Sequence, residues 1–333
     1  MPATRPTRHP TRHLRSHRFD GLEAGPRLIV TGAVHGNETC GTRGIERVLV
    51  ELQRGDIELV RGCLTLVPVC NPLAYAKGQR SGERNLNRRL QPTPQPAQYE
   101  DHIANVLCPL LAAHDVLLDL HSFRSPGRPF VLRGPANNSG ALEPFGHAAA
   151  EAALAAHAGP SRIVEGWMRA YSGGIERRRA RAAAGDGAAA AAIEEASYGI
   201  GTTEYMRSQG GYGITLECGQ HDDAGAPEVA YRAIRQVLAL LKLVDTGPAE
   251  PVASARPFEC LALAEVIDRD AEGDHFVRAW TSFDAVAEGQ LIAQRADGTP
   301  VPAPWAGYIV FPDPGAAPGH EWFYLARASE RPL

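Results

Sequence analysis

His35 and Glu38 stand three residues apart, directly after the apolar run 28–34, which is typical of a buried strand. The turn after such a strand can bring both side chains to one metal ion. A third ligand, His121, lies at the end of a second apolar run, 116–122. Two imidazoles and one carboxylate, with a fourth position left to water, form the ligand set of a catalytic zinc site. The sequence therefore predicts one Zn²⁺ per chain, bound by these three residues.

Asp119 precedes His121 by two residues, so both side chains are expected on the same face of one strand. Histidines that bind a metal usually donate their other N–H group to a carboxylate or a carbonyl. Asp119 is therefore predicted to orient the imidazole of His121.

The segment 71–90 supplies Arg80, Asn87 and Arg88 within nine positions, and Arg207 follows further along the chain. The planar guanidinium of arginine binds carboxylates through two parallel hydrogen bonds, and an asparagine amide can donate a third. These residues are predicted to bind a substrate that carries a carboxylate.

Glu217 ends the apolar segment 213–217, where an acid is costly to bury unless it has a partner or a task. Beside a metal-bound water, a buried glutamate can act as general base and then as general acid. The alternative is a structural ion pair between Glu217 and one of the arginines.

The elements that must position these residues alternate along the chain. The pattern indicates strands at 28–34, 63–69, 116–121, 129–133, 161–166 and 213–217, and helices at 41–53, 97–112, 143–157 and 226–243. This alternation predicts an α/β fold with a mostly parallel mixed sheet and helices on both faces. Ligands bind such sheets at the carboxyl ends of the strands, where His35 and His121 fall.

Three regions are expected. Residues 1–19 form a basic tail, predicted to be disordered, because no acidic residue precedes Asp20. Residues 20–247 form the catalytic domain, in which 176–196 is an Ala- and Arg-rich helical excursion. After a Pro/Ala linker, 252–333 form a small β domain that resembles a biotinyl/lipoyl-type sandwich. This part contains no lysine, which excludes the attachment of such a cofactor.

Composition limits the partners and the location. A net charge of −4 argues against a nucleic-acid partner, and no apolar stretch is long enough to span a bilayer. The six cysteines include no C-x-x-C pair, which favours free thiols and a cytoplasmic location. The sequence is also compatible with a homo-oligomer.

Four motifs together resemble the succinylglutamate desuccinylase/aspartoacylase family of the zinc carboxypeptidase-like fold. They are GAVHGNE (32–38), NP with RNLNR (71–72 and 84–88), DLHS (119–122) and TLECGQH (215–221). The resemblance implies zinc at His35, Glu38 and His121, with Glu217 as the catalytic carboxylate. It places Arg80 near the scissile carbonyl, and Asn87, Arg88 and Arg207 on substrate carboxylates. Thr203 stands where the aspartoacylases have a tyrosine, which counts against N-acetylaspartate as the substrate.

The predicted function is therefore a zinc-dependent amidohydrolase that removes the acyl group from an N-acyl amino acid or a similar small carboxylate. A metallocarboxypeptidase that acts on peptides is one alternative. A non-catalytic zinc-dependent binding protein is the other, although such a protein has no use for a buried base at position 217.

Overall fold

The computed structural model describes residues 11, 13–183, 196–245, 257–331 and 333. The central element is an eleven-stranded sheet with the order β1-β3-β2-β4-β7-β5-β6-β8-β14-β13-β10, and the strands β12, β11 and β9 form a separate sheet. The strands are β1 (His17–Asp20), β2 (Glu23–Gly32), β3 (Arg61–Val67), β4 (Val116–Phe123), β5 (Phe130–Leu132), β6 (Arg162–Glu165), β7 (Tyr212–Gln220), β8 (Glu259–Asp268), β9 (His275–Phe276), β10 (Asp284–Val286), β11 (Leu291–Gln294), β12 (Pro300–Pro302), β13 (Gly307–Val310) and β14 (Glu321–Ala328).

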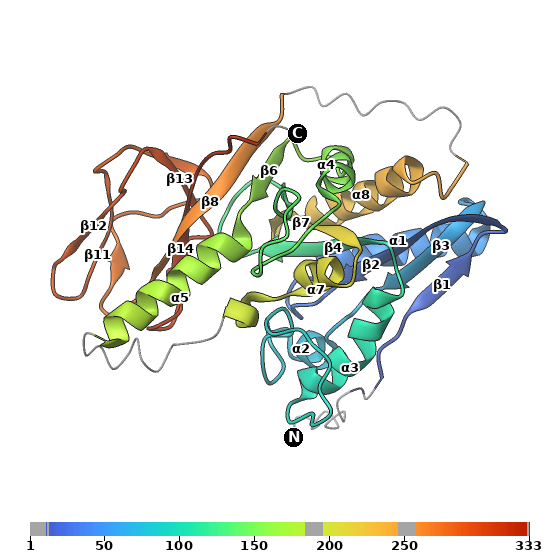
Figure 1. Ribbon diagram of the computed structural model, residues 1–333, viewed down its shortest axis with the longest axis horizontal. Coiled ribbons are helices and arrows are strands. Elements are labelled where there is room, and N and C mark those ends of the chain that lie inside the picture. The colour runs from blue at the N-terminus through green and yellow to red at the C-terminus, as the bar shows by residue number, and fades with distance from the viewer. Residues whose placement is uncertain (1–10, 12, 184–195, 246–256, 332) are drawn as a thin grey trace, which may run out of the picture.

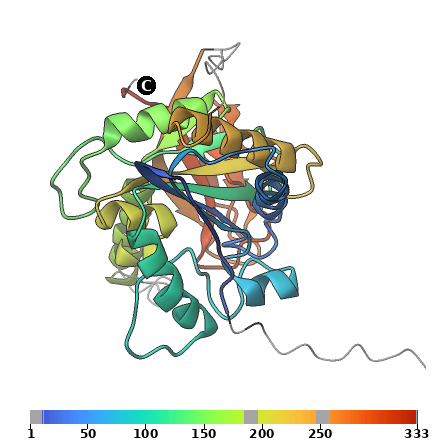
Figure 2. The ribbon, with the colours of Figure 1, turned by 90° about the vertical axis from the view of Figure 1, so that its right-hand side faces the viewer.

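Helices cover both faces of this sheet (Figures 1 and 2). Leu28 and Val30 of β2 point to the side of α1 and α8, whereas Ile29 points to the side of α3 and α7. This alternation buries both faces of β2 and explains its continuous apolar run. The helices are α1 (Cys40–Arg54), α2 (Pro72–Lys77), α3 (Tyr99–Ala112), α4 (Ala148–His157), α5 (Trp167–Ala183), α7 (Thr202–Ser208) and α8 (Ala226–Leu240), with the 3-10 helix η1 (Ala196–Gly199).

The parallel strands bring the predicted ligands to one edge of the sheet. β2 pairs in parallel with β3 and β4, and β4 pairs in parallel with β7. The register places His121 of β4 directly beside Glu217 of β7. The α/β fold with a mostly parallel core and helices on both faces is thereby confirmed, as is each of the six predicted strands, to within a few residues.

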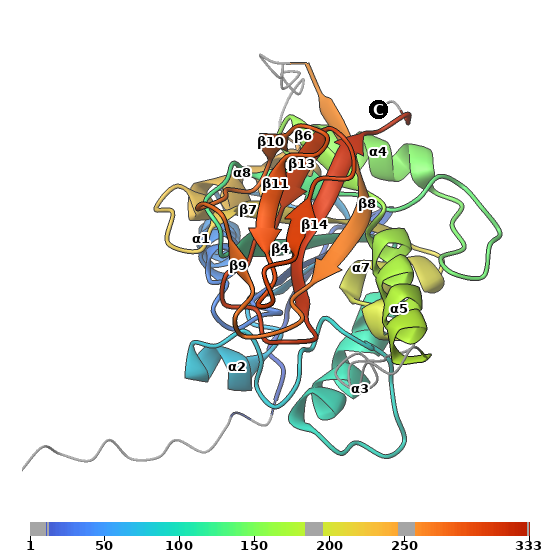
Figure 3. The same cartoon turned by 90° about the vertical axis from the view of Figure 1, so that its left-hand side faces the viewer.

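The last strands continue the same sheet. β8 pairs in parallel with β6, and β14 pairs antiparallel with β8 (Figure 3). The segment that was expected to be a separate β domain therefore extends the sheet of the catalytic region, and it has its own core around Trp322 and Phe323. The proposed boundaries at 247 and 252 stay a prediction, as does the likeness to a biotinyl/lipoyl-type sandwich.

Two local expectations need adjustment. The basic tail was expected to reach residue 19, but His17–Asp20 form β1, which pairs antiparallel with β3. The Ala- and Arg-rich stretch begins inside α5, and residues 184–195 of it lie outside the described residues. None of the described helices combines the length and the apolar character that crossing a bilayer requires.

Candidate metal centre and active site

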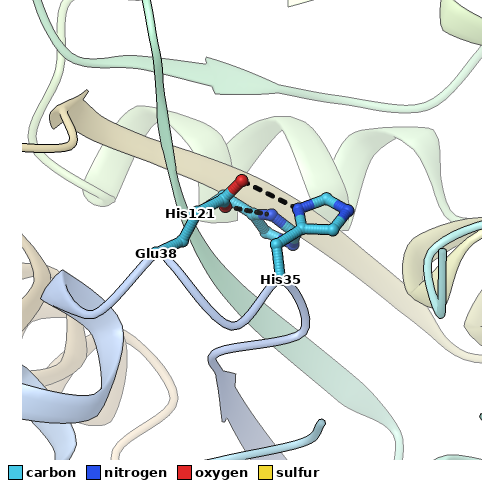
Figure 4. A group of neighbouring side chains, drawn as sticks. All are labelled: His35, Glu38 and His121. Carbon is cyan, nitrogen blue, oxygen red and sulfur yellow. Dashed lines mark hydrogen bonds and ion pairs between the residues drawn. The ribbon is translucent and has the colours of Figure 1, made fainter. Parts of the chain in front are cut away.

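Glu38 lies between the two histidines that were predicted to share a metal with it (Figure 4). Its Oε1 is 2.9 Å from Nδ1 of His35, and its Oε2 is 2.9 Å from Nδ1 of His121. All three side chains are buried, and one ligand atom from each lies within 4.8 Å of the others. Sequence reasoning therefore selected three residues that the fold brings to one point.

The loop after β2 is shaped by close backbone contacts. Ala33 has a φ of +46°, a conformation that costs free energy for a residue with a Cβ. Backbone hydrogen bonds from Cys70 to Gly32 and from Asn71 to Ala33 hold this turn in place. A Cβ on Gly36 would lie 2.0 Å from the carbonyl carbon of Ala74, so only glycine fits between His35 and the start of α2. The turn thereby folds His35 back toward Glu38.

Hydrogen bonds orient both imidazoles. Nε2 of His35 lies 3.0 Å from Oδ1 of Asn85, and Nε2 of His121 lies 2.8 Å from Oδ2 of Asp119. Asp119 in turn accepts hydrogen bonds from the hydroxyls of Thr31 and Thr202. With both Nε2 atoms occupied in this way, the Nδ1 atoms are left to bind a cation.

Burial and neighbouring charges shift the pKa values of these groups in opposite directions. Burial lowers the pKa of His35 to about 4, and the Arg80 charge adds to this effect. Burial also acts to lower the pKa of His121, but the charges of Asp119 and Glu38 outweigh it and raise that pKa. For Glu38, burial opposes ionisation, yet the two imidazoles and their hydrogen bonds lower the pKa. Glu38 is therefore an anion at neutral pH.

The three residues fit a divalent cation. Nδ1 of His35 makes no hydrogen bond despite its short distance to Glu38, so a buried lone pair is left for another partner. Two imidazole nitrogens and a carboxylate suit zinc among the common biological metals. This fit was predicted from the spacing of the motifs.

Glu217 is the strongest candidate for a catalytic carboxylate. It is buried beside His121 on the neighbouring strand, and its Oε2 has no hydrogen-bond partner. Burial raises its pKa to about 8, although the nearby His121 charge acts in the opposite direction. No ion pair of Glu217 occurs among the described residues, so the structural alternative has no partner there.

Arg80, Asn87 and Arg88 line the same cavity. Within the described residues, each keeps side-chain N–H groups that no protein acceptor uses. Nη1 of Arg80 is 3.0 Å from Oε1 of Glu38, which places this guanidinium against the metal ligands. Oδ1 of Asn87 accepts a hydrogen bond from the backbone N–H of Thr202, so the amide N–H₂ group is left to donate into the cavity. Arg88 lies over the ring of Trp167, and within the described chain its guanidinium makes one hydrogen bond, to the carbonyl of Asn87.

Arg207 differs from these residues, because its guanidinium is already occupied. Its Nε and Nη2 bind both oxygens of the buried Glu151, at 3.0 and 2.9 Å, and Nη2 also donates to the carbonyl of Gly213. Its Nη1 binds Glu143 at 2.7 Å and Glu204 at 3.3 Å. The geometry therefore argues against the predicted role of Arg207 as a clamp for a substrate carboxylate.

The site lies in a cavity of about 240 Å³. Its walls include residues to which sequence reasoning gave no role, among them Ser122 and Glu204, and the C-terminal residues Phe311, Glu321 and Tyr324. Asn85, which orients His35, is also new, although it lies inside the RNLNR motif and could have been found there. The C-terminal residues carried no such signal, because their place depends on how β14 joins the sheet.

Comparisons with known proteins agree with this geometry. The family model of the succinylglutamate desuccinylase/aspartoacylase catalytic domain matches residues 24–244. The chain therefore belongs to this family, as its motifs predicted.

One curated relative is the N-α-acetyl-L-2,4-diaminobutyric acid deacetylase of Halomonas elongata. It is 33% identical over 104 residues, a match that spans only 29% of this chain and 29% of the relative. Two solved structures show the same fold. The product-bound ectoine utilization protein EutE (DoeB) from Ruegeria pomeroyi has a TM-score of 0.68 at 21% identity, over 94% of this chain and 88% of that one. A succinylglutamate desuccinylase/aspartoacylase from Rhodobacter sphaeroides has a TM-score of 0.68 at 16% identity, over 95% and 90%.

Metal binding is expected to release protons. The charges of Asp119 and Glu38 raise the pKa of His121 and favour its protonated form, whereas a histidine binds zinc only as the neutral imidazole. Calorimetric titration of metal-free protein with Zn²⁺, in buffers of different ionisation enthalpy, should show the release of at least about one proton per chain. A binding enthalpy that does not depend on the buffer would contradict this picture.

Arg207→Met and Arg88→Met should have different consequences. Removing Arg207 leaves the buried Glu151 without its cationic partner and should lower the free energy of unfolding by about 3–5 kcal/mol. Arg88 has no ion pair among the described residues, so its replacement should cost about 1 kcal/mol or less while weakening substrate binding. Urea unfolding of both variants measures the contrast. Equal losses of unfolding free energy in the two variants would show that the ion pairs of Arg207 do not stabilise the fold more than Arg88 does.

Proposed function

We propose that the protein is a zinc-dependent deacylase that hydrolyses the amide bond of an N-acyl amino acid or a similar small carboxylate. The observation that carries this proposal is the buried, unpartnered Oε2 of Glu217 beside the metal-binding group. Membership of the family and the deacetylase named among the relatives support the reaction class. The six cysteines are free thiols, which is compatible with the cytoplasmic location that we also propose.

The proposed chemistry assigns one task to each residue. Zinc held by His35, Glu38 and His121 would supply Lewis-acid polarisation of the acyl carbonyl and would acidify water. Glu217 takes a proton from the attacking water at its free Oε2 and then gives it to the leaving amine. Arg80 stabilises the negative charge that develops on the former carbonyl oxygen. Arg88 and the amide of Asn87 bind the carboxylate of the substrate.

The two rival functions fit the site less well. A peptidase needs room for a chain on at least one side of the scissile bond, whereas Phe311 and Tyr324 of the C-terminal segment wall this cavity. A binding protein without activity would gain nothing from Glu217, because burial of an unpartnered carboxyl lowers stability. Amine release from N-acyl amino acids, compared with a blocked dipeptide, separates the first rival from the proposal.

Glu217→Gln provides the decisive test. We expect kcat to fall by a factor on the order of 10² to 10⁴, the usual contribution of positioned acid–base catalysis, with zinc content unchanged. The free energy of unfolding, in contrast, should rise in this variant. The folded-state pKa of about 8 lies above the ordinary value, so wild-type protein loses stability as pH rises from about 5 to 8. Metal-free Glu217→Gln lacks this loss and should be more stable at pH 8, by on the order of a few kcal/mol.

Glu228→Gln on the exposed surface of α8 is the matched control, and it should change neither kcat nor the pH dependence appreciably. A Glu217→Gln protein with near-wild-type rates and a much lower melting temperature would defeat the catalytic role. It would reinstate Glu217 as a structural group.

A further inference from the structure

A second cavity, of about 620 Å³, is formed mainly by the C-terminal segment and is not used by the proposed chemistry. This volume lies in the usual range for a small-molecule site. Its lining comes from the loop after β4, the segment 269–280, the residues that follow β13, and Trp322 of β14. Arg124, Ser125 and Pro312 line both this cavity and the catalytic one, so the two cavities share a wall.

Hydrogen bonds fix the shared wall. The buried hydroxyl oxygens of Ser125 and Ser282 lie 2.8 Å apart, and Oγ of Ser282 accepts the backbone N–H of Phe311 at 3.0 Å. Phe311 has a φ of +51°, so its backbone needs such support. The boundary between the two cavities is therefore held by the backbone, and the second cavity is a site of its own.

Arg269 brings to the second cavity a positive charge that no acid balances. Four of its five N–H groups donate to backbone carbonyls, at distances of 2.6 to 3.3 Å, namely those of Glu272, Asp274, Pro314 and Ala316. The fifth, on Nε, is buried and makes no hydrogen bond within the described residues. No carboxylate in that part of the chain forms an ion pair with this guanidinium, so an anion is the partner it lacks.

The other charged groups of the second cavity are compensated within the protein. Three ion pairs involve its lining residues: Arg124 with Asp313 at 2.9 Å, Arg278 with Asp284 at 3.1 Å, and Asp274 with Arg295 at 2.8 Å. Glu272 is exposed, so water and salt screen its charge. The charge of Arg269 is therefore the one that a ligand would balance.

Trp322 supplies a second donor without a partner. Its side chain is only 1% exposed, and its indole N–H makes no hydrogen bond within the described residues. Trp280, which also lines the cavity, shows the contrast, because its N–H donates to the carbonyl of Ile292 at 3.0 Å. A buried indole N–H usually has an acceptor, so the one of Trp322 indicates a missing ligand.

The two unpartnered donors share one face of the sheet. Glu321 of β14 pairs with Asp268 of β8, and the backbone pairing continues with a hydrogen bond from Arg269 N to His320 O. Successive residues of a strand point to opposite faces. Trp322 and Arg269 each follow one residue of the pair, so both lie on the face opposite Glu321 and Asp268. They reach the same cavity from adjacent strand ends.

We propose that the second cavity binds a small organic carboxylate with an apolar body, whose oxygens accept the N–H groups of Arg269 and Trp322. A carboxylate has two oxygens and a negative charge, which suits two N–H donors and one uncompensated guanidinium. An apolar body would be buried against the rest of the lining, which includes Pro126, Phe276, Ala279, Trp280, Pro312 and Pro314. Inorganic phosphate could use the donors but would leave this apolar wall without a partner.

The four tryptophans of the chain allow a direct test by NMR. Trp280 and Trp322 line the second cavity, Trp167 lines the catalytic cavity, and Trp305 lines neither of these two. Full-length protein labelled with ¹⁵N-tryptophan gives one indole N–H signal per residue, assigned by single Trp→Phe substitutions. Titration with benzoate should shift the Trp322 signal downfield and to saturation, because a hydrogen bond deshields the indole proton. The Trp305 signal should stay in place.

Two variants test the donors. Trp322→Phe keeps an aromatic ring and removes the N–H, and the Trp280 signal then reports binding. The loss of one charge-assisted hydrogen bond should weaken benzoate binding about tenfold. Arg269→Lys keeps the charge without the Nε donor and should weaken binding to a similar degree. Melting temperatures show whether both variants retain the fold. Arg88→Met is the matched control, because it removes a guanidinium from the catalytic cavity, and it should leave the Trp322 titration unchanged.

Three results would overturn the proposal. A benzoate shift confined to Trp167, or a Trp322 shift that Arg88→Met abolishes, would place the carboxylate in the catalytic cavity. No saturable shift of the Trp322 signal with benzoate or hexanoate would show that the second cavity does not bind such ligands. Binding of inorganic phosphate as tight as that of benzoate would show that the apolar wall contributes nothing. None of these results bears on the deacylase function, which is measured by amine release.

Discussion

The carboxylate of Glu38, buried between two imidazoles, is the constraint on which the rest of the site depends. An isolated buried charge is very costly, so the fold must surround this one with compensating groups. His35 supplies one from the loop after β2, His121 supplies another from β4, and Arg80 supplies a third from the loop after α2. Each imidazole is then fixed by a further acceptor, Asn85 or Asp119. A metal ion that displaces the proton of His121 would complete this balance, because two neutral imidazoles and one anion then leave room for positive charge.

The arginines of the cavity show how one residue type takes different tasks according to its partners. Arg207 is enclosed by acids and a backbone carbonyl, so its hydrogen-bonding capacity is used within the protein. Arg88 lies against Trp167 and keeps unused donors. A guanidinium binds a ligand only with the donors that the protein leaves free. The number of nearby arginines therefore says little about the charge of a ligand until their partners are known.

Much of the site could be predicted because its residues lie at strand ends. Parallel strands end at one edge, so His35 and His121 had to meet once 28–34 and 116–121 were recognised as strands. Asp119 followed from the two-residue period of a strand. The partners of Arg207, in contrast, could not be predicted from its place in the sequence. Its partners Glu143 and Glu151 come from a loop and a helix more than fifty residues away, and no local pattern links them. The same holds for β1, whose place beside β3 cannot be inferred from a basic composition.

The C-terminal strands change what the active site can accept. β8 joins β6 in parallel and β14 pairs with β8, so the sheet carries Tyr324 and Glu321 to the cavity that the first half of the chain began. A separate appended domain could move away from the site, whereas strands hydrogen-bonded into one sheet hold their side chains at fixed distances from the metal ligands. The backbone hydrogen bonds that pair β14 with β8 therefore also hold one wall of the cavity in place. This pairing limits how far the β14 side of the cavity can widen, which fits the small substrates that we propose.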